Sequence, residues 1–420
     1  MIMRISSKTI YDVGVGQIGT LQSALARTQA QLSTGRKNLT AADDPIATAR
    51  ALEVTQSQGI NTQLVTNRSN AKSMLSLETV ALHSSGVIMQ DIKSLLVDAG
   101  NGSRTQKDRE SLAVELEGRL NDLLGQANSS DGVGGYVFSG YKSTTLPFTQ
   151  TATGAAYQGD QGQRSLQVGS TRTLPISDSG SAVYENNATG NGTFVTGAAA
   201  ANFDRGGSGI ISGGSVKDAT QLTGHKYQID FQVVAATPGV PKVTTYTVTD
   251  TTLNQPVPAT PVPAVPQSYV SGQNITFDGL QFDIKGDPAN LDTFEIVPST
   301  KQSVFTTITD IIGALRAPGT GPAGQANLTN KLNQAHLNVD NAYDNMLSIE
   351  SAVGSRLKEL DYLDSSGDDL NLQYATTLSG LQDVDVVKAI SLFTQQQTNL
   401  DAAQKSFKTL AGLSLFNYIS

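Results

Sequence analysis

Apolar residues near both ends of the chain recur at helical spacing, whereas the middle of the chain alternates between apolar and polar residues. In the first segment, Ile18, Leu21, Leu25, Thr28 and Leu32 follow the spacing of a coiled-coil seam. A second helix is predicted over 57–98, about 60 Å long at the usual rise per residue. Its expected seam is Ile60, Leu64, Asn67, Ala71, Met74, Leu77, Ala81, Ser84, Ile88, Ile92 and Leu95.

Further helices are marked by their end signals. Gly100-Asn101-Gly102 should end the second helix, and Thr105 with Asp108 resembles a capping box that starts the next one. Near the other end of the chain, Asp383 and Asp385 precede a final helix, where carboxylates favour the positive end of the helix dipole. The predicted apolar stripes are Leu112, Leu116, Leu120, Leu123 and Ala127, then Leu328, Leu332, Ala335, Val339, Ala342, Met346, Ile349, Val353, Leu357 and Leu360, then Val386, Ile390, Phe393, Gln397, Leu400, Phe407 and Leu410.

From about 135 to 300 the apolar period changes to two, which indicates β-strands bounded by Gly, Pro and Asn turns. The predicted strands are GGYVFSGYK, HKYQIDFQVV, KVTTYTVTD, QNITFDGLQFDIKG and DTFEIVP. The stretch NNATGNGTF and the run RGGSG are interpreted as flexible surface loop, and PVPATPVPAVP at 256–266 as a polyproline-type loop.

These patterns predict an α+β fold in which the N- and C-terminal helices form a long coiled-coil rod and a mainly-β domain is inserted between them. Each helical stripe is too narrow to bury itself, so the helices of the two ends should pack on each other. The expected organisation is an N-terminal assembly segment 1–40, rod helices 41–134, a β-hairpin region 135–183, an inserted β domain 184–300, rod helices 301–382 and an assembly helix 383–420.

The composition of the chain argues against several classes of function. Hydrophobic residues make up 38% and charged residues 16% of the 420 residues, and with 6% aromatic residues and no Trp we expect no large aromatic core. The net charge of −8 argues against a general nucleic-acid binder. Cysteine is absent, which excludes disulfides and thiolate metal sites. No stretch approaches the ~20 apolar residues of a membrane span, and the N-terminus is not expected to be a cleavable secretory signal.

Motifs that carry chemistry in other proteins have plainer explanations here. Gly14, Gly16 and Gly19 fit G-x-G-x-x-G, but no buried strand precedes them, so a dinucleotide site is not expected. Asp43-Asp44-Pro45 is better explained as a helix cap. The histidines, His83, His225 and His336, are scattered singly, and no metal, cofactor or catalytic motif accompanies them. We therefore predict no cofactor, no metal and no enzymatic activity.

Two long segments resemble the flagellin superfamily of bacterial flagellar proteins. QAQLSTGRKNLTAADDPIATARA (29–51) is similar to its N-terminal signature, and VGSRLKELDYL (353–363) with the segment 383–420 to its C-terminal one. Within the superfamily, the opening MRISSKTIY, the block GGYVFSGYKSTTLPF (134–148) and the ending SLFNYIS resemble the hook-associated protein 3 (hook–filament junction) family. Residues 184–300 match nothing recognisable.

The resemblance implies a secreted structural subunit of the extracellular flagellum, exported unfolded with the help of a dedicated chaperone. It also implies self-assembly into a ring or helical layer between the preceding hook-associated protein and flagellin, with no nucleic acid and no membrane insertion. We expect both end segments to be disordered in the free subunit and to order on assembly.

The assembly interface is expected on the terminal stripes, because these can bury their apolar face only against neighbouring subunits. The candidate residues are Ile18, Leu21, Leu25, Leu32, Ile390, Phe393, Leu400, Phe407, Leu413 and Phe416. Two other functions stay open at this point. The chain could be a flagellin that builds the long filament, or a surface adhesin whose β insert binds a ligand.

Overall fold

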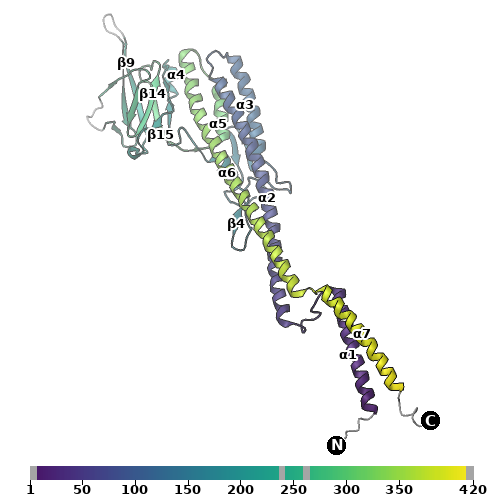
Figure 1. Ribbon diagram of the computed structural model, residues 1–420. Coiled ribbons are helices and arrows are strands. Elements are labelled where there is room, and N and C mark those ends of the chain that lie inside the picture. Colours follow the sequence, from purple (N-terminus) through teal and green to yellow (C-terminus); the bar gives the residue numbers. More distant parts are fainter. Residues whose placement is uncertain (1–6, 236–241, 259–264, 413–420) are drawn as a thin grey trace, which may run out of the picture. The chain divides into compact units, whose positions relative to one another are not determined.

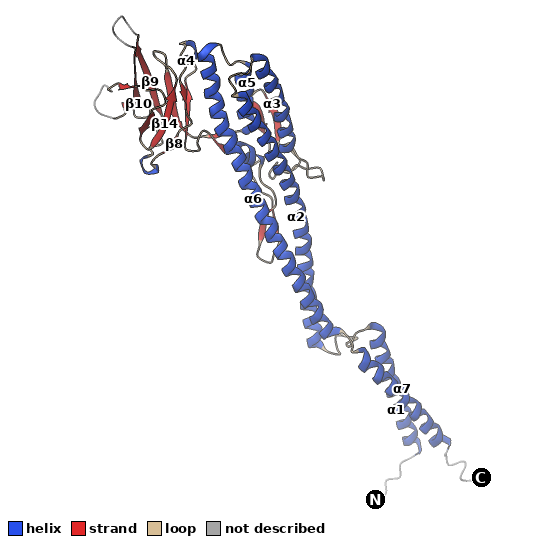
Figure 2. Cartoon of the chain, turned by 45° about the horizontal axis from the view of Figure 1, so that its top comes forward, coloured by secondary structure: helices blue, strands red, loops and turns tan. Residues whose placement is uncertain are grey.

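A computed structural model describes residues 7–235, 242–258 and 265–412. It divides into two compact units, one formed by Met1–Thr66 with Tyr362–Ser420 and the other by Asn67–Asp361. We call them the terminal unit and the central unit. Helices dominate the N- and C-terminal parts of the chain, and the strands lie between them in sequence (Figures 1 and 2). The predicted α+β class with a mainly-β insert is therefore confirmed.

The central unit contains a four-helix bundle. Its helices are the later part of α2 (Pro45–Ala99), α3 (Gln106–Ala127), α5 (Val304–Arg316) and the earlier part of α6 (Gly321–Gln382). The helix ends follow the sequence signals: α2 stops before Gly100, and Thr105 and Asp108 form the expected capping box of α3. Every residue of the predicted α3 stripe is buried.

Helices α2 and α6 run antiparallel in one register. Three contacts connect them, and successive contacts are separated by the same number of residues on both helices: the ion pairs Lys72–Asp361 and Lys93–Asp340, and between them the approach of His83 to Glu350. The predicted α6 stripe faces the interior, where Leu328, Leu332, Ala335, Val339, Ala342, Met346, Val353 and Leu360 are buried and Ile349 and Leu357 partly buried.

Ala71, Ala81 and Ile92 are buried as predicted, but most other positions of the α2 seam are displaced by one residue from the predicted ones. Beyond Ala71, the fully buried positions are Leu75, Glu78, Leu82, Ser85, Met89, Ile92 and Leu96. Leu77, expected in the seam, is 41% exposed. The prediction was wrong for Leu77 and Ser84, because the buried polar residues of this seam are Glu78 and Ser85, each one position further along the helix.

The segment between α3 and the insert contains short hairpins and an aromatic cluster. Its elements are β1 (Phe148–Thr151), β2 (Gly154–Tyr157), β3 (Ser165–Gln167), β4 (Thr173–Pro175) and a π-helical turn, Ser181–Glu185. Tyr184 is fully buried, with ring centroids 5.6 Å from those of Phe138, Phe148 and Phe305, and its hydroxyl lies 2.9 Å from Ser85 Oγ. The expectation of no large aromatic core was therefore wrong for this unit.

The structure bears on two further sequence predictions in this region. GGYVFSGYK forms bends and turns instead of a strand, since Gly134 and Gly140 have positive φ angles of 98° and 69°. Tyr184, placed at the first position of the β insert, packs in the bundle. We therefore propose that the insert starts after this turn.

A buried carboxyl pair fastens this segment to the bundle. Glu78 Oε1 accepts a hydrogen bond from Asp178 N at 3.0 Å, while Oε2 is buried without a hydrogen-bond partner among the described residues. Asp178 accepts from both Arg356 terminal nitrogens, at 2.8 and 3.2 Å, and from Gln163 Nε2 at 2.6 Å. Burial, together with the nearby Asp178 charge, raises the pKa of Glu78 to about 8.

The β insert consists of two antiparallel sheets. The strands of the larger sheet are ordered β11-β10-β9-β15-β6, with β12 also paired to β10, and those of the smaller sheet β13-β14-β7, with β8 also paired to β14. The strands of the larger sheet are β6 (Phe194–Ala198), β9 (Tyr227–Val234), β10 (Val243–Asp250), β11 (Gln255–Pro256), β12 (Gln267–Ser268) and β15 (Thr293–Pro298). Those of the smaller sheet are β7 (Ile210–Ile211), β8 (Ser215–Val216), β13 (Asn274–Phe277) and β14 (Leu280–Lys285). A short helix, α4 (Ala201–Asp204), and a 3₁₀ turn (Ala219–Gln221) connect some of these strands. The other four predicted strand segments are confirmed as β9, β10, the β13–β14 hairpin and β15, while part of the proline-rich loop lies outside the described residues.

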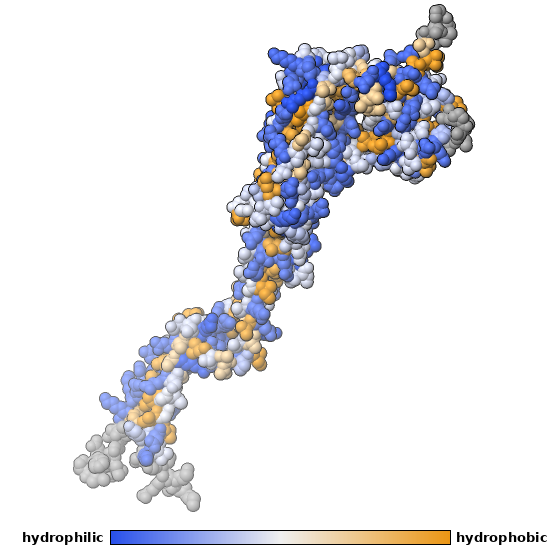
Figure 3. Space-filling model, turned by 180° about the vertical axis from the view of Figure 1, so that it is seen from behind, coloured by the Kyte–Doolittle hydropathy of each residue, from blue (hydrophilic) through white to orange (hydrophobic). Residues whose placement is uncertain are grey.

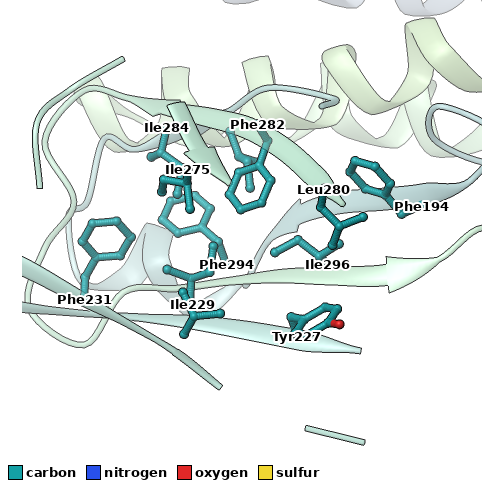
Figure 4. Packing of buried hydrophobic residues seen from close by; sticks show 12 residues of the cluster. Phe194, Tyr227, Ile229, Phe231, Ile275, Leu280, Phe282, Ile284, Phe294 and Ile296 are labelled. Carbon is teal, nitrogen blue, oxygen red and sulfur yellow. The ribbon is translucent and has the colours of Figure 1, made fainter. Parts of the chain in front are cut away.

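Both sheets contribute side chains to one apolar core. Figure 4 shows Phe231, Phe294 and Ile229 of the larger sheet pointing toward Phe282 and Ile284 of the smaller one. The insert therefore has a hydrophobic core distinct from the aromatic cluster of the bundle. Its first and last long strands, β6 and β15, are direct neighbours, so the chain enters and leaves at the same place.

A row of asparagines on α6 holds the base of the insert. Asn345 Nδ2 donates to Ala182 O and Val183 O, Asn341 Nδ2 to Ala188 O and Gly190 O, and Asn338 Oδ1 accepts from Gly190 N, all at 2.8–3.1 Å. Asn330 binds Gly209 O and Ile211 N in the same way. Residues expected to be flexible loop are thus packed, because these amides satisfy their backbone groups.

The titration of Glu78 predicts a stability change with pH. Because the pKa of Glu78 is higher in the folded chain than in the unfolded chain, ionisation of this side chain favours unfolding. The contribution of protonated Glu78 to stability is complete below the unfolded pKa near 4.5 and is lost as the pH rises toward about 8. We expect the free energy of unfolding to fall across that window by a few kcal/mol, at about 1.4 kcal/mol per pKa unit. Chemical denaturation at pH 5 and pH 8 measures it. The variant Glu78→Gln, which keeps an acceptor for Asp178 N but cannot ionise, should lose this part of the slope. An unchanged slope would contradict the assignment.

The insert should be removable if Tyr184 is kept. Joining Thr189 to Thr300 through a short glycine linker should leave the helices folded, since Thr189 N already donates to Thr300 O at 3.0 Å. A deletion of 184–300 also removes the buried Tyr184 and should cost about 3–5 kcal/mol more, as large-to-small core changes do. Circular dichroism melting of both deletions makes the comparison. Loss of helix in the first deletion would show that the helices need the insert.

Candidate assembly interface

Helices α1 (Ser7–Thr34) and α7 (Val386–Gly412) form an antiparallel hairpin in the terminal unit. On α1 the predicted stripe is the least exposed face: Thr28 is buried, and Ile18, Leu21, Leu25 and Leu32 are partly buried. On α7 the matching positions are Ala389, Phe393, Gln396, Leu400, Ala403 and Phe407. The spacing of three and four residues is that of a two-helix seam, which confirms the predicted seam of α1.

The hairpin is closed near Gly35 by backbone hydrogen bonds. Arg36 pairs with Asp383 in a short antiparallel bridge, Lys37 N donates to Gln382 O, and Val384 N donates to Gly35 O, at 2.8 and 2.9 Å. Gly35 has a φ of 69°, which favours glycine at this sharp end of α1. The two chain ends are thereby aligned over most of their described length.

The segment Asp43-Asp44-Pro45 caps α2 as predicted. Asp44 Oδ1 accepts a hydrogen bond from Ala47 N at 2.9 Å. Asp43 accepts from Leu39 N and Thr40 N at 2.9 Å and pairs with Arg27 at 2.6 Å, and these hydrogen bonds lower its pKa. Asp385 likewise caps α7 by accepting from Lys388 N at 3.0 Å. Asp44 and Asp385 therefore define the starts of α2 and α7.

The glycine motif has a packing role. A Cβ on Gly14 would lie 2.7 Å from the Phe407 ring, so glycine lets α1 approach α7 there, next to the Tyr11–Phe407 ring contact. Gly16 and Gly19 face open space within the chain. The whole motif lies within α1.

The candidate assembly residues separate into two groups in the structure. Ile18, Leu21, Leu25, Leu32, Phe393, Leu400 and Phe407 line the seam of the hairpin. Ile390 lies off the seam and is 53% exposed. Leu413 and Phe416 lie outside the described residues. The expected disorder of the free ends concerns the subunit in solution and stays a prediction.

Large apolar side chains remain exposed around this hairpin and on the neighbouring helix ends. We call them the terminal apolar set: Tyr11, Val13, Val15, Ile46, Leu52, Ile60, Tyr362, Leu370, Leu372, Val386, Val387, Ile390 and Leu392. Val387 is 81% exposed and Ile46 80%. Apolar residues are visible along the helices that lead to the grey chain ends in Figure 3. Sequence reasoning missed most of them because it selected residues in the seam, whereas these lie off it.

The three histidines have different surroundings. His83 is exposed beside Glu350, His336 is half-buried, and His225 Nδ1 lies 2.6 Å from Asp250 Oδ2. No group of three or more His, Cys, Asp or Glu residues in the described part of the chain could hold a metal ion. Among those same residues, none of the helices has the length and apolar character needed to cross a membrane.

Comparisons with known proteins agree with this arrangement. Residues 5–143 match the bacterial flagellin N-terminal helical region. The chain is 27% identical over 415 residues to flagellar hook-associated protein 3 of Salmonella typhimurium and 25% identical to the protein of that name from Escherichia coli, each match covering 99% of both chains.

Solved structures give the same relationship. The structure of flagellar hook associated protein-3 from Legionella pneumophila matches with a TM-score of 0.72 and 30% identity, over 78% of this chain and 98% of that one. Xanthomonas campestris FlgL matches with a TM-score of 0.69 and 28% identity, over 78% of this chain and 99% of that one. With matching ends, fold and full-length relatives, the chain belongs to the flagellar hook-associated protein 3 family.

Proposed function

We propose that this chain is the structural subunit that joins the hook of the bacterial flagellum to its filament. The observation that carries the proposal is the terminal apolar set, a group of large apolar side chains left exposed around the packed ends of a flagellin-like chain. A hairpin two helices thick cannot cover these side chains itself. Neighbouring subunits in an assembled layer would cover them, which is favourable by about 25 cal/mol per Å² of buried apolar surface.

The partners follow from the names of the relatives. They are hook-associated and junction proteins, so we propose that this chain assembles with copies of itself, with a preceding hook-associated protein and with flagellin outside the cell. An export chaperone would keep the ends unpaired until assembly. We propose no catalytic role, because the polar clusters described above are occupied in holding helix ends and loops.

Deleting the gene for this chain tests the function. We expect cells with complete hooks but no filaments, and flagellin released into the medium, because the adaptor between the two is missing. Electron microscopy of the cell surface and analysis of the medium measure both effects. Filaments on the deleted cells would exclude the junction role. Long fibres grown by the purified chain alone would instead favour the flagellin alternative.

The terminal apolar set can be tested without disturbing the hairpin. The double variant Val387→Asp/Ile390→Asp places two charges on exposed positions of α7, so melting of the purified chain should stay within a few degrees of the unaltered chain. Assembly should fail, because burying an unpaired charge between subunits is costly. We expect motility to fall at least tenfold while the chain is still exported.

The matched control is Gln395→Asp/Asn399→Asp, which adds the same charge to exposed polar positions of the same helix. These cells should swim normally. If both double variants were equally immotile, added charge alone would explain the loss, and the terminal apolar set would lose its assigned role.

A further inference from the structure

The four helices of the central bundle are arranged in a closed order. Helix α2 lies next to α3, where Asp91 and Arg119 approach to 3.6 Å. Helix α3 lies next to α5, where Arg316 pairs with Glu110 and Glu117. Helices α5 and α6 share a hollow, and α6 returns to α2 through Lys93 and Asp340. The α2/α3 side and the α5/α6 side are therefore opposite sides of the bundle.

A rigid loop at the end of α3 exposes one apolar side chain. Val133 is 87% exposed, the highest fraction among the large apolar residues of the described chain. Its loop is fixed by Asp131, whose Oδ1 accepts from Val133 N and Gly135 N at 3.0 and 2.8 Å and whose N donates to Gly135 O. Gly132 and Gly134 flank Val133 with φ angles of 79° and 98°. A loop whose backbone is already held in one conformation loses little entropy on binding.

Part of the exposed face of α2 is also apolar. Leu77, Val80 and Val87 are 41–65% exposed and lie on one side of the helix. A solvent-facing helix surface usually carries charged residues. The chain as a whole carries a net charge of −8, so electrostatic repulsion between copies is weakest where the contacting surfaces carry few charges.

The opposite side of the bundle has a hollow of suitable size. A cavity of about 270 Å³ lies between α5 and α6, with Ile311, Ala314, Leu332 and Ala335 in its apolar wall. Asp310 and Lys331 are exposed at its rim. This volume is below the range of about 300–1,000 Å³ that small-molecule sites occupy. It suits a protein side chain better than a metabolite.

We propose that these two features form a contact between copies of this chain, in which the Val133 loop of one copy enters the α5/α6 hollow of the next. The contact rests on the proposed function, since it requires an assembled layer. Lys331 at the rim would face the carboxylate of Asp131 beside the loop tip. Because the two surfaces lie on opposite sides of one bundle, the contact is head-to-tail and propagates from copy to copy.

Cysteine cross-linking tests this contact directly, since the chain has no native cysteine. Flagella are isolated from cells that express the full chain with Val133→Cys and Lys331→Cys together, and are then oxidised. We expect a ladder of covalent dimers, trimers and larger species on a denaturing gel. Each single variant should stay a monomer. The pair Val133→Cys with Val270→Cys, an exposed position in the insert, is the matched control and should not cross-link.

Two outcomes would overturn the contact. One is motile cells whose double-variant flagella give no cross-link. The other is dimers from Val133→Cys alone, which would indicate a symmetric contact. If the double variant does not assemble, cells that express the two single variants together should give a heterodimer, and its absence also counts against the proposal. Filaments on cells without the gene would instead refute the junction function itself, so the two failures are distinguishable.

Discussion

The fold depends on N-terminal helices packing against C-terminal helices that are distant in the sequence. An isolated helix with a narrow apolar stripe is marginal in water, because most helical stability in proteins comes from tertiary packing. Here Lys72, His83 and Lys93 of α2 meet Asp361, Glu350 and Asp340 of α6 in one register, and α1 meets α7 along a second seam. Since the cost of closing a loop grows slowly with its length, a β insert of over a hundred residues can stand between such partners.

Polar side chains inside this packing determine where the intervening segments attach. Glu78 and Ser85 occupy the buried seam of α2, where each binds one residue of the same segment, Asp178 and Tyr184 respectively. Asn338 and Asn341 of α6 bind backbone groups at the base of the insert. Buried polar groups are costly unless they are hydrogen-bonded, so these contacts favour one placement of each segment over others. Apolar packing alone would specify those positions less strictly.

The chain leaves part of its apolar surface uncovered, and this links its folding to its function. The seam of the α1–α7 hairpin covers Leu400, whereas Val387 and Ile390 on the same helix stay exposed. A monomer that buried all of its apolar stripes would have no exposed apolar surface left to favour assembly. Under the function proposed for this chain, the same burial that stabilises helices within a subunit would also join subunits, and assembly would then continue the process that folds the ends.

The sequence by itself determined the end of α2, the starts of α3 and α7, the α1, α3 and α6 stripes, and four of the five predicted strand segments, because caps, turns and apolar periodicity are local properties. Its terminal motifs also indicated the family. Only the tertiary structure decided which side of α2 is buried, that Tyr184 belongs to the bundle, and that Gly14 is a packing residue against Phe407. Each of these depends on partners in other elements of the structure. Spacing along one helix reveals which residues share a face, but only the partner element decides whether that face is covered, and by what.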